Sequence, residues 1–349
     1  MYILAFETSC DDTSIAIFQD DILIAMDTAS QIKIHALTGW VVPEVAAREH
    51  ANAIFDVLKN VLEQAGFNNS LQITHSTLQE GIDHIAVTAT PWLMPSLLTW
   101  LSVARTLGNI HNIPVHEINH IQAHIFANFL ERKKSDIQFP LVCLTVSWGH
   151  NELYHMQDMW DFNRVGGTTD DAAWEAFDKV AKMMWLGYPG WPIISQLADT
   201  YAANHPDIKP KHPQEKTLFP RVWLEKKWPD FSFSGLKSAV KREVDTRSCS
   251  ADGSSASLSE SDIQEIAYEF QNAATEVLAY KLVNTAKNYW VKTCLLAGGV
   301  SANDHLKKLI QDLAQQAGIT FTYPTKKVFC MDNAAMVGMI AYYKITEAK

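Results

Sequence analysis

The chain has 349 residues, of which 47% are hydrophobic and 19% charged, and its net charge is −10. This composition is typical of a soluble globular protein large enough for two lobes, and the negative charge argues against a protein that coats nucleic acid by itself. Five scattered cysteines argue against a disulfide framework. With no signal-peptide pattern and no apolar run near the ~18 residues of a membrane span, we expect a cytoplasmic protein.

The first half of the chain predicts three strands followed by an alternation of helix and strand. These elements span residues 2–9, 13–18, 22–26, 45–64, 85–88, 96–107, 115–118 and 118–129. A similar set begins at residue 141. Its strands span 141–147, 152–156 and 293–297, and its helices span 172–185, 263–287, 302–317 and 333–346. The repeated pattern predicts an α/β protein of two related lobes with a cleft between them.

The repeat also predicts how the two lobes divide the chain. We expect lobe I to contain residues 1–113 and the C-terminal helix 333–349. Lobe II is then 114–332, with the metal-site helix, the ligand-binding loops and a mobile segment near 246–262, which is rich in serine. Residues 202–230 are predicted to be irregular.

His120 and His124 lie four residues apart in the predicted helix 118–129. Residues i and i+4 share one face of a helix, so the two imidazoles can reach one metal ion. The alternative is two histidines at this spacing by chance. Zinc proteases of the HExxH type have a glutamate directly after the first histidine, whereas this chain has Ile121. The sequence therefore argues against protease chemistry.

Several turns have the residues of a phosphate or adenylate site. Residues 9–13 and 147–151 each join two strands and offer backbone N–H groups and hydroxyls. Gly298-Gly299 leads from a strand into a helix, whose N-terminus favours an anion, although plain strand-to-helix turns look alike.

Acidic residues beside predicted helices are candidates for helix capping or for a functional role. Asp332 precedes the last helix, so it is either a metal ligand or an N-cap. The pair Asp170-Asp171 also precedes a helix and invites the N-cap interpretation. Asp178, farther along that helix, is a candidate to bind a substrate hydroxyl or amine.

Taken in order, these motifs resemble the TsaD family of tRNA N6-adenosine threonylcarbamoyltransferases nearly from end to end. The resemblance rests on Glu7–Thr13, Val41–His50, His120 with His124, Asp170–Ala173, Glu175–Lys179, Tyr188–Gly190, Phe231–Lys237, Gly298–Asn303 and Asp332–Met336.

The resemblance implies a two-lobed actin/Hsp70/sugar-kinase-like (ASKHA) fold with a duplicated βββαβα core and an interlobe cleft. It implies transfer of threonylcarbamoyl from threonylcarbamoyl-AMP to N6 of the adenosine 3′ of the anticodon, giving t6A in tRNAs that read ANN codons. It also implies TsaB-like and TsaE-like partner proteins, which would supply basic surface that this acidic chain lacks.

The resemblance also assigns site residues by position. His120, His124 and Asp332 would ligate one divalent metal, Fe²⁺ or alternatively Zn²⁺, and Asp11 and Asp12 would lie near the reacting group. The residues expected to bind the adenylate are Thr145, Val146, Ser147, Trp148, Gly149, Asp178, Trp191 and Asn303. Cys10 is not expected to be a nucleophile, because a cysteine at a strand end is usually a small buried apolar residue.

Tryptophan replaces glycine at many positions of the family pattern. The seven securely aligned positions are Trp40, Trp92, Trp100, Trp148, Trp174, Trp185 and Trp191, and Trp160, Trp228 and Trp290 look similar. The chain also has only 15 glycines, against the usual ~7%. We hypothesise that UGA codons read as glycine in the source cell have been translated as tryptophan. If the tryptophans are real, Trp148 and Trp191 would block the adenylate site.

Two alternative functions follow from the same sequence. A catalytically inactive TsaD-like scaffold fits if the tryptophans of the cleft are real, although the retained His120, His124 and Asp332 argue against it. A sugar kinase would share the fold, but such kinases hold Mg²⁺ through carboxylates and phosphates, which the histidine pair does not match.

Overall fold

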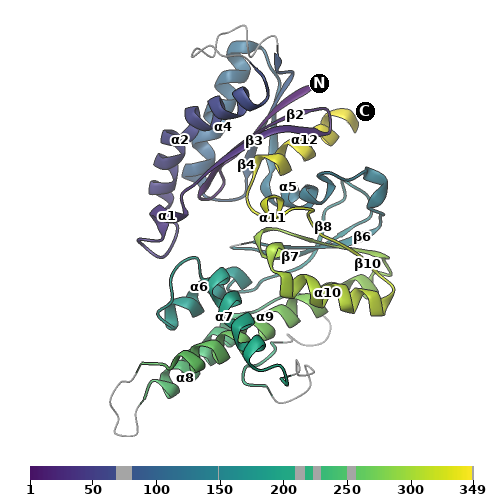
Figure 1. The fold of residues 1–349 in the computed structure, drawn as a ribbon. Coiled ribbons are helices and arrows are strands. Elements are labelled where there is room, and N and C mark those ends of the chain that lie inside the picture. Colours follow the sequence, from purple (N-terminus) through teal and green to yellow (C-terminus); the bar gives the residue numbers. More distant parts are fainter. Residues whose placement is uncertain (68–80, 148, 209–216, 223–228, 250–256, 348–349) are drawn as a thin grey trace. The chain divides into compact units, whose positions relative to one another are not determined.

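The structure is a computed structural model that describes residues 1–67, 81–147, 149–208, 217–222, 229–249 and 257–347 (Figure 1). Its contacts divide the chain into two compact units. The first unit consists of Met1–Ile137 and Tyr323–Lys349, and the second unit is Gln138–Thr322. The second unit is thus inserted, in sequence, between the two segments of the first.

The first unit is built on a five-stranded mixed sheet with the order β3-β2-β1-β4-β5. Three strands form an antiparallel meander, and β4 and β5 run parallel to β1. The bounds are β1 Tyr2–Glu7, β2 Asp12–Gln19, β3 Ile22–Ser30, β4 His84–Thr90 and β5 Val115–Asn119.

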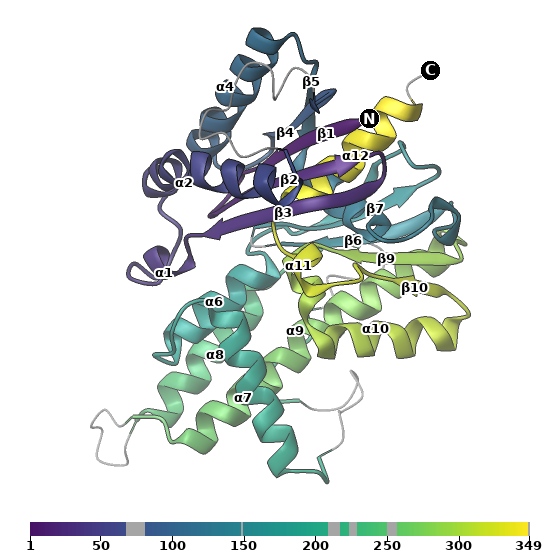
Figure 2. The same ribbon diagram turned by 45° about the horizontal axis from the view of Figure 1, so that its top comes forward.

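Successive residues of β1 point to opposite faces of this sheet, as strand geometry requires. Leu4 and Phe6 belong to an apolar cluster with residues of α2 (Pro43–Gln64) and α4 (Met94–His111), which cover one face. Figures 1 and 2 show α12 (Ala334–Glu347) on the other face. Glu7 therefore points away from α2 and α4.

α12 packs unusually close to the sheet, and one glycine allows this. A Cβ added at Gly338 would lie 2.5 Å from the ring of Phe18 and 3.4 Å from Cβ of Ala5. The start of α12 is fixed by two side chains. Ser14 Oγ accepts a hydrogen bond from Ala334 N (3.0 Å), and Asn333 Oδ1 accepts one from Met336 N (3.1 Å).

Shorter elements complete the first unit. They are α1 Ile32–His35, α5 His120–Phe126, η1 Ala127–Phe129, η2 Lys134–Asp136 and α11 Lys327–Cys330. α5 follows β5 directly, so the histidine helix begins at residue 120 and not at 118 as expected. Asn119 Oδ1 caps it by accepting a hydrogen bond from Gln122 N at 3.1 Å.

The second unit repeats the sheet of the first. Its order is β10-β9-β6-β7-β8, with β6, β7 and β8 antiparallel and with β9 and β10 parallel to β6. The bounds are β6 Leu141–Val146, β7 Asn151–Met156, β8 Asn163–Gly167, β9 Thr293–Ala297 and β10 Thr320–Thr322. Because chain order and pairing correspond strand by strand, the predicted duplication is confirmed.

Helices of the second unit connect its strands. They are α6 Ala173–Met183, α7 Gly190–Asn204, α8 Ser234–Arg247, α9 Glu260–Asn288, η3 Gly299–Ala302 and α10 Asp304–Ala317. α9 is the long central helix, and most of its residues are buried. Buried Arg221 donates to Glu276 of α9 from Nε at 2.7 Å.

The structure differs from the sequence expectations at several places. Residues 114–137 and 323–332 belong to the first unit and not to the second, because β5 pairs with β4 and carries α5 with it. β8, β10, α7 and α8 were not predicted, and α7 reaches into the segment 202–230 that was expected to be irregular. Of the segment expected to be mobile, residues 250–256 lie outside the described residues.

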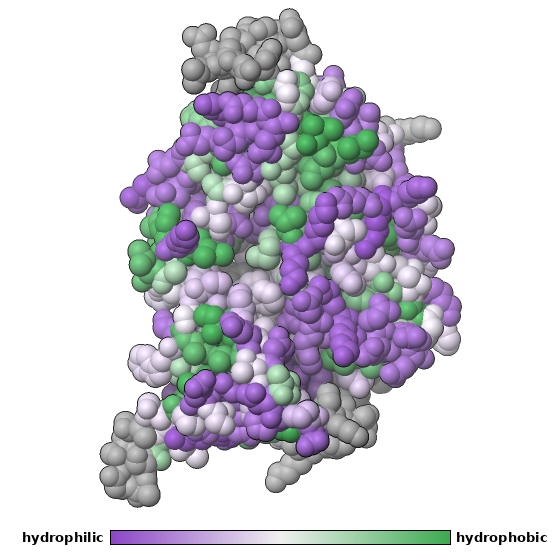
Figure 3. Space-filling view, in the orientation of Figure 1, coloured by the Kyte–Doolittle hydropathy of each residue, from purple (hydrophilic) through white to green (hydrophobic). Residues whose placement is uncertain are grey.

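The face of the molecule in Figure 3 mixes hydrophilic surface with separate apolar patches. One patch lies over α1 and the turn after it, where Leu37 and Trp40 are exposed. Within the described part of the chain, no helix combines the length and the apolar character that crossing a membrane requires.

Candidate metal centre

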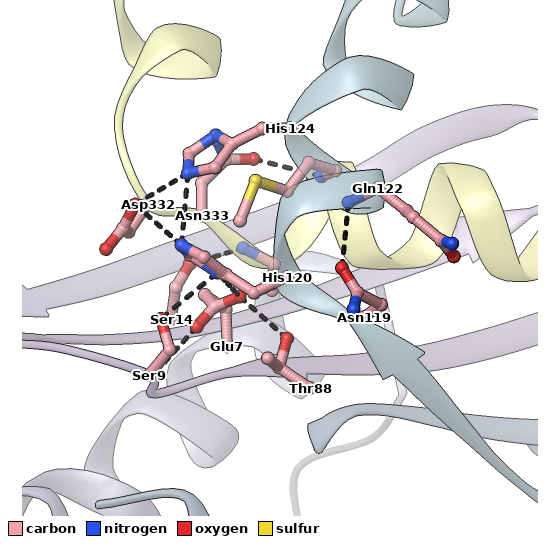
Figure 4. A network of polar contacts seen from close by, with 12 residues as sticks. Glu7, Ser9, Ser14, Thr88, Asn119, His120, Gln122, His124, Asp332 and Asn333 are labelled. Atoms are coloured by element: carbon pink, nitrogen blue, oxygen red, sulfur yellow. Dashed lines mark hydrogen bonds and ion pairs between the residues drawn. The ribbon is translucent and has the colours of Figure 1, made fainter. Parts of the chain in front are cut away.

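His120, His124 and Asp332 converge in the first unit (Figure 4). Nε2 of His124 lies 3.1 Å from Nε2 of His120 and 3.1 Å from Oδ1 of Asp332, and Nε2 of His120 lies 3.7 Å from the same oxygen. Both imidazoles are buried, whereas the Asp332 side chain is 23% exposed. The i, i+4 spacing on α5 therefore places two ring nitrogens against one carboxylate.

The structure tests the N-cap interpretation of Asp332. The residue that caps α12 is Asn333, whose Oδ1 accepts a hydrogen bond from Met336 N. Asp332 is thereby left to face the histidines. Asn333 is therefore the N-cap of α12, and the N-cap interpretation of Asp332 is wrong.

A buried carboxylate lies behind His120. Glu7 Oε2 is 3.1 Å from Nδ1 of His120 and accepts a hydrogen bond from Thr88 Oγ1 at 2.7 Å. Glu7 Oε1 accepts one from Ser9 N at 2.6 Å, and Ser9 Oγ lies 3.1 Å from Nδ1 of His120. Figure 4 shows these side chains beneath α5. Sequence reasoning assigned Glu7 no role.

The charges of this cluster stabilise one another. Burial opposes a charge on His120, but the Glu7 and Asp332 carboxylates outweigh burial and raise the pKa of His120 to about 9. Burial likewise opposes the carboxylate charges, yet His120 lowers the pKa of Glu7 and of Asp332 below their ordinary values. Burial, assisted by the charge of His120, lowers the pKa of His124, which keeps this second imidazole neutral.

The donor set fits a divalent metal. The two imidazole nitrogens and the carboxylate oxygen lie within 4.8 Å of one another. Two histidines and one carboxylate form the facial triad of non-haem Fe²⁺ sites and are also a usual ligand set for Zn²⁺. Nδ1 of His124 is buried and has no hydrogen-bond partner within the described residues. All three predicted ligands are thus brought together by the fold.

Asp11 lies in the turn between β1 and β2, and Asp12 is the first residue of β2. Burial raises the pKa of both, and the neighbouring Asp11 carboxylate helps to raise that of Asp12 to about 7. The charge of Asp332 contributes to both shifts. Cys10 is buried, and burial together with Asp11 raises its thiol pKa far above the ordinary value. A thiolate nucleophile at Cys10 is therefore disfavoured.

The predicted adenylate residues lie in the second unit, around the ends of β6 and β9. Thr145 and Val146 end β6, and Ser147 follows with a buried Oγ that has no partner within the described residues. Gly298 has φ +84°, and a Cβ there would lie 2.4 Å from the Val146 carbonyl oxygen. Only glycine fits at this close approach. Gly149 is half-buried, and Trp148 lies outside the described residues.

Asp178 and Asn303 are engaged in backbone contacts. Asp178 Oδ1 accepts a hydrogen bond from Gly190 N at 2.7 Å, which ties α6 to the start of α7. Asn303 Oδ1 caps α10 by accepting one from Leu306 N at 2.8 Å, and its Nδ2 lies 3.4 Å from Ser195 Oγ.

Two tryptophans gather beside the Gly298-Gly299 turn. The rings of Trp174 and Trp191 are 5.1 Å apart, and a Cβ at Gly299 would lie 3.1 Å from the Trp174 ring. Nε1 of Trp191 is buried with no partner within the described residues. The indoles therefore occupy the surroundings of the predicted adenylate turn.

The N-cap interpretation of Asp170-Asp171 is wrong. Asp170 accepts hydrogen bonds from Phe233 N (2.8 Å) and from Ser232 Oγ (2.5 Å). Asp171 pairs with Lys179 at 2.7 Å and also with Lys237. The two carboxylates therefore join the start of α6 to the segment before α8.

A family model described as "TsaD: tRNA N6-adenosine threonylcarbamoyltransferase" matches residues 22–339. The chain belongs to the TsaD family. The Persephonella marina tRNA N6-adenosine threonylcarbamoyltransferase is 38% identical over 352 residues, covering 100% of this chain and 91% of that protein. The protein of the same name from Bacillus subtilis (strain 168) is 40% identical over 349 residues, covering 99% and 91%. This TsaD-family member is therefore a transferase that modifies adenosine in tRNA.

Solved structures agree on the fold. Component A of the (R)-2-hydroxyglutaryl-CoA dehydratase of Acidaminococcus fermentans matches with a TM-score of 0.50 at 13% identity, covering 99% of both chains. The activator of the Clostridium difficile 2-hydroxyisocaproyl-CoA dehydratase also gives 0.50 at 13% identity, covering 100% of this chain and 97% of that chain. The expected ASKHA fold of this TsaD-family member is confirmed.

Proposed function

We propose that the chain transfers threonylcarbamoyl from threonylcarbamoyl-AMP to N6 of the adenosine 3′ of the anticodon in tRNAs that read ANN codons. The observation that carries this is the convergence of His120, His124 and Asp332 in a TsaD-family member. The donor carbonyl belongs to a mixed anhydride and is already activated. No covalent protein nucleophile is needed, which agrees with the buried Cys10 thiol.

His120, His124 and Asp332 would hold one divalent metal, which we propose to be Fe²⁺, with Zn²⁺ as the alternative. When bound, such an ion supplies Lewis-acid stabilisation of negative charge on a carbonyl oxygen. The protein contributes the buried, preorganised ligand set and, through Glu7, a carboxylate against the outer nitrogen of His120.

Asp11 and Asp12 are the proposed catalytic acids and bases. The adenine amine is a weak nucleophile and loses a proton as its nitrogen bonds to the carbamoyl carbon and AMP departs. A base works best when its pKa lies near the operating pH, and the pKa of Asp12 is raised to about 7. Asp12 is therefore suited to accept that proton, with Asp11 sustaining its raised pKa.

The adenylate is proposed to bind at the β6 and β9 turns of the second unit. The proposed contacts are Thr145, Val146, Ser147, Trp148, Gly149, Asp178, Trp191 and Asn303. The close approach at Gly298 and the unpartnered Ser147 hydroxyl support this. Asp178 and Asn303 are proposed to act partly by fixing the helix starts that they already bond.

The proposed partners are tRNA and TsaB-like and TsaE-like proteins, in the cytoplasm. The net charge of −10 supports a need for partners, because a polyanion such as tRNA is bound mainly through cationic surface.

The test is reconstituted transfer. The chain with glycine at the seven aligned tryptophan positions, a TsaB-like and a TsaE-like protein, tRNA and threonylcarbamoyl-AMP are combined, and t6A is measured by nucleoside mass spectrometry. His124→Ala and Asp12→Asn are expected to lower t6A formation by at least about 100-fold, the size of an acid–base contribution. Full activity of His124→Ala would contradict the proposed site.

The inactive scaffold stays as the alternative, and the tryptophans beside the Gly298-Gly299 turn favour it if they are real. The same assay discriminates. The form with glycine at all seven aligned tryptophan positions should form t6A, and the form with tryptophan there should not. A scaffold would show no activity in either form.

A further inference from the structure

Glu7 is a buried carboxylate at the end of β1, and its side chain is fully inaccessible to solvent. It accepts hydrogen bonds from Ser9 N (2.6 Å) and Thr88 Oγ1 (2.7 Å), and it meets Nδ1 of His120 at 3.1 Å. Burying a carboxylate is costly unless it is well hydrogen-bonded. The fold satisfies this requirement and directs one oxygen at a single imidazole nitrogen.

A carboxylate oxygen accepts hydrogen bonds and cannot donate them when it is ionised. Nδ1 of His120 must therefore carry a proton and donate it to Glu7. This orients the ring so that Nε2 faces His124 and Asp332. His124 has no such support, because its Nδ1 lacks a partner within the described residues.

We propose that Glu7 is a positioning residue for the metal centre: it fixes the orientation of His120 and the nitrogen that His120 offers to the metal. This inference rests on the proposed metal site. Strand alternation explains why Glu7 can do this, since Glu7 and Thr88 point to the sheet face that α5 covers, opposite to Phe6 and Val87.

The first test is titration of the purified full chain with Co²⁺, followed by its d–d absorption. Removal of a partner that orients a ligand typically costs about 10–100-fold in metal affinity. We expect Glu7→Gln to weaken Co²⁺ binding by that factor. Thr88→Val is the matched control: it removes a donor to Glu7 but keeps the contact of Glu7 with His120, so its affinity should change less than about threefold.

The second test needs no metal. The Nδ1–H proton of His120 should give a protected, downfield NMR resonance in the wild type and in Thr88→Val. This resonance should move upfield in Glu7→Gln, whose neutral amide oxygen is a weaker acceptor than a carboxylate, and it should lose its protection in Glu7→Ala. Unchanged resonance and unchanged Co²⁺ affinity in a folded Glu7→Gln protein would overturn the positioning role. Failure of the wild type to bind Co²⁺ would instead overturn the metal site, and the resonance would still decide the role of Glu7.

Five helices, α2, α4, α6, α9 and α10, end in the same way. One residue adopts the left-handed conformation, and the next residue donates a backbone hydrogen bond five residues back. The donors and acceptors are Phe67 to Leu62, Ile113 to Gly108, Leu186 to Ala181, Val291 to Ala286 and Ile319 to Ala314, at 2.9–3.1 Å.

The left-handed residue differs among these five ends. It is Gly66, Asn112 and Gly318 in three of them, which are the residue types that adopt this conformation at little cost. It is Trp185 (φ 59°) and Trp290 (φ 58°) in α6 and α9. These two indoles are 94% and 89% exposed, so packing does not offset the strain.

We infer that positions 185 and 290 are glycine positions of this protein, encoded by UGA codons that the source cell reads as glycine. The left-handed backbone supports glycine at both positions independently of any family pattern, and the UGA codons are the proposed cause of tryptophan there. UGG codons at either position, or tryptophan in the peptide mass of the natively produced protein, would overturn it.

Stability measurements test the conformational argument. Trp185→Gly and Trp290→Gly should each lower the unfolding equilibrium constant about 5–30-fold in denaturant titrations, which corresponds to the cost of a left-handed non-glycine residue. Trp185→Ala and Trp290→Ala should lower the unfolding equilibrium constant much less. The reverse change, Gly318→Trp, meets open space and should raise the constant by a similar factor. Equal effects of alanine and glycine would contradict the argument.

Discussion

Asp332 and Asn333 show how two adjacent residues divide the tasks at one helix start. Asn333 caps α12, and Asp332 faces the two histidines. The sequence predicted that one residue here either caps a helix or binds a metal. It could not decide which, because the answer depends on where the first helical turn begins, and this is set by Ser14 bonding Ala334 from the sheet.

This division predicts opposite phenotypes for two neighbouring substitutions. Asn333→Ala removes the cap and should cost about 1 kcal/mol of unfolding free energy, while Co²⁺ still binds. Asp332→Asn should abolish tight Co²⁺ binding and leave the cap in place. Thermal unfolding and Co²⁺ titration of both variants check this, and a loss of metal binding in Asn333→Ala alone would contradict it.

Asp12 predicts a pH dependence of stability. Burial and Asp11 raise its folded-state pKa to about 7, so between pH ~4, its unfolded value, and pH 7 the folded state binds more protons than the unfolded state. Stability contributed by this group therefore falls as pH rises through that window. In metal-free protein, Asp12→Asn should match the wild type near pH 4.5 and be more stable near pH 8. A pH-independent difference would refute the shift.

The two histidines of the candidate metal centre could be predicted from the sequence to lie together, whereas the residue that supports them could not. Histidines at i and i+4 indicate a shared face whatever the tertiary structure. Glu7 lies in a run of apolar strand residues, and its function depends on which sheet face α5 covers. The signal was available in principle: a glutamate at the end of the buried strand Tyr2–Glu7 needs a partner.

Among the elements, long amphipathic or apolar segments were predicted and weakly patterned ones were missed. α9 was predicted within three residues at its start and one at its end. α8 buries only Leu236, Val240 and Val244, a narrow stripe in a polar helix. β10 has three residues and is an edge strand that exists through pairing with β9. Tertiary contacts, which local sequence does not contain, define these elements.

The packing of α12 on β2 predicts a sensitive glycine. Gly338→Ala would place a Cβ 2.5 Å from Phe18, and overpacking of this kind costs about 1–3 kcal/mol. Gly235→Ala, on α8, is the matched control because its Cβ would meet Val222 at an ordinary 3.7 Å. Denaturant midpoints should fall for Gly338→Ala and not for Gly235→Ala. Equal midpoints would show that α12 can shift freely.

The tryptophan pair beside the Gly298-Gly299 turn predicts a gain of function. Trp174→Gly and Trp191→Gly together should tighten binding of AMP by at least about tenfold, or ~1.4 kcal/mol, because the indoles fill the surroundings of the proposed adenylate turn. Trp160→Gly is the control, because Trp160 lies in the same unit and its side chain is partly exposed. Calorimetry measures the affinity, and an unchanged value would place AMP elsewhere.

For the whole molecule, the repeated pattern predicted two related halves, and the two sheets confirm them. The two units begin and end at other residues than the expected lobes, for a topological reason. The chain leaves the first unit after Ile137 and returns to it at Tyr323. The last helix, α12, therefore packs on the same sheet that β1 belongs to. Local sequence patterns reveal a repeated unit, but they do not reveal at which residue the chain leaves one unit and re-enters it.

The charge of the whole chain predicts weak binding of tRNA by itself. With a net charge of −10, the isolated protein should bind tRNA at least about tenfold more weakly than a mixture with a TsaB-like protein at physiological salt. Fluorescence anisotropy of labelled tRNA measures this. Tight binding by the isolated chain would reveal a local cationic surface that suffices without a partner.

The insertion of residues 138–322 into the first unit has a consequence for biosynthesis. A growing chain that has passed His124 holds two ligands, but the third is not made until the ribosome has translated the entire inserted unit. If the proposed metal binds, it can do so only late in synthesis. It would then close a loop of some two hundred residues, which would hold the second chain segment on its sheet. Protein made without the proposed metal should then be cleaved first near α12 in limited proteolysis, because its final helix detaches most readily.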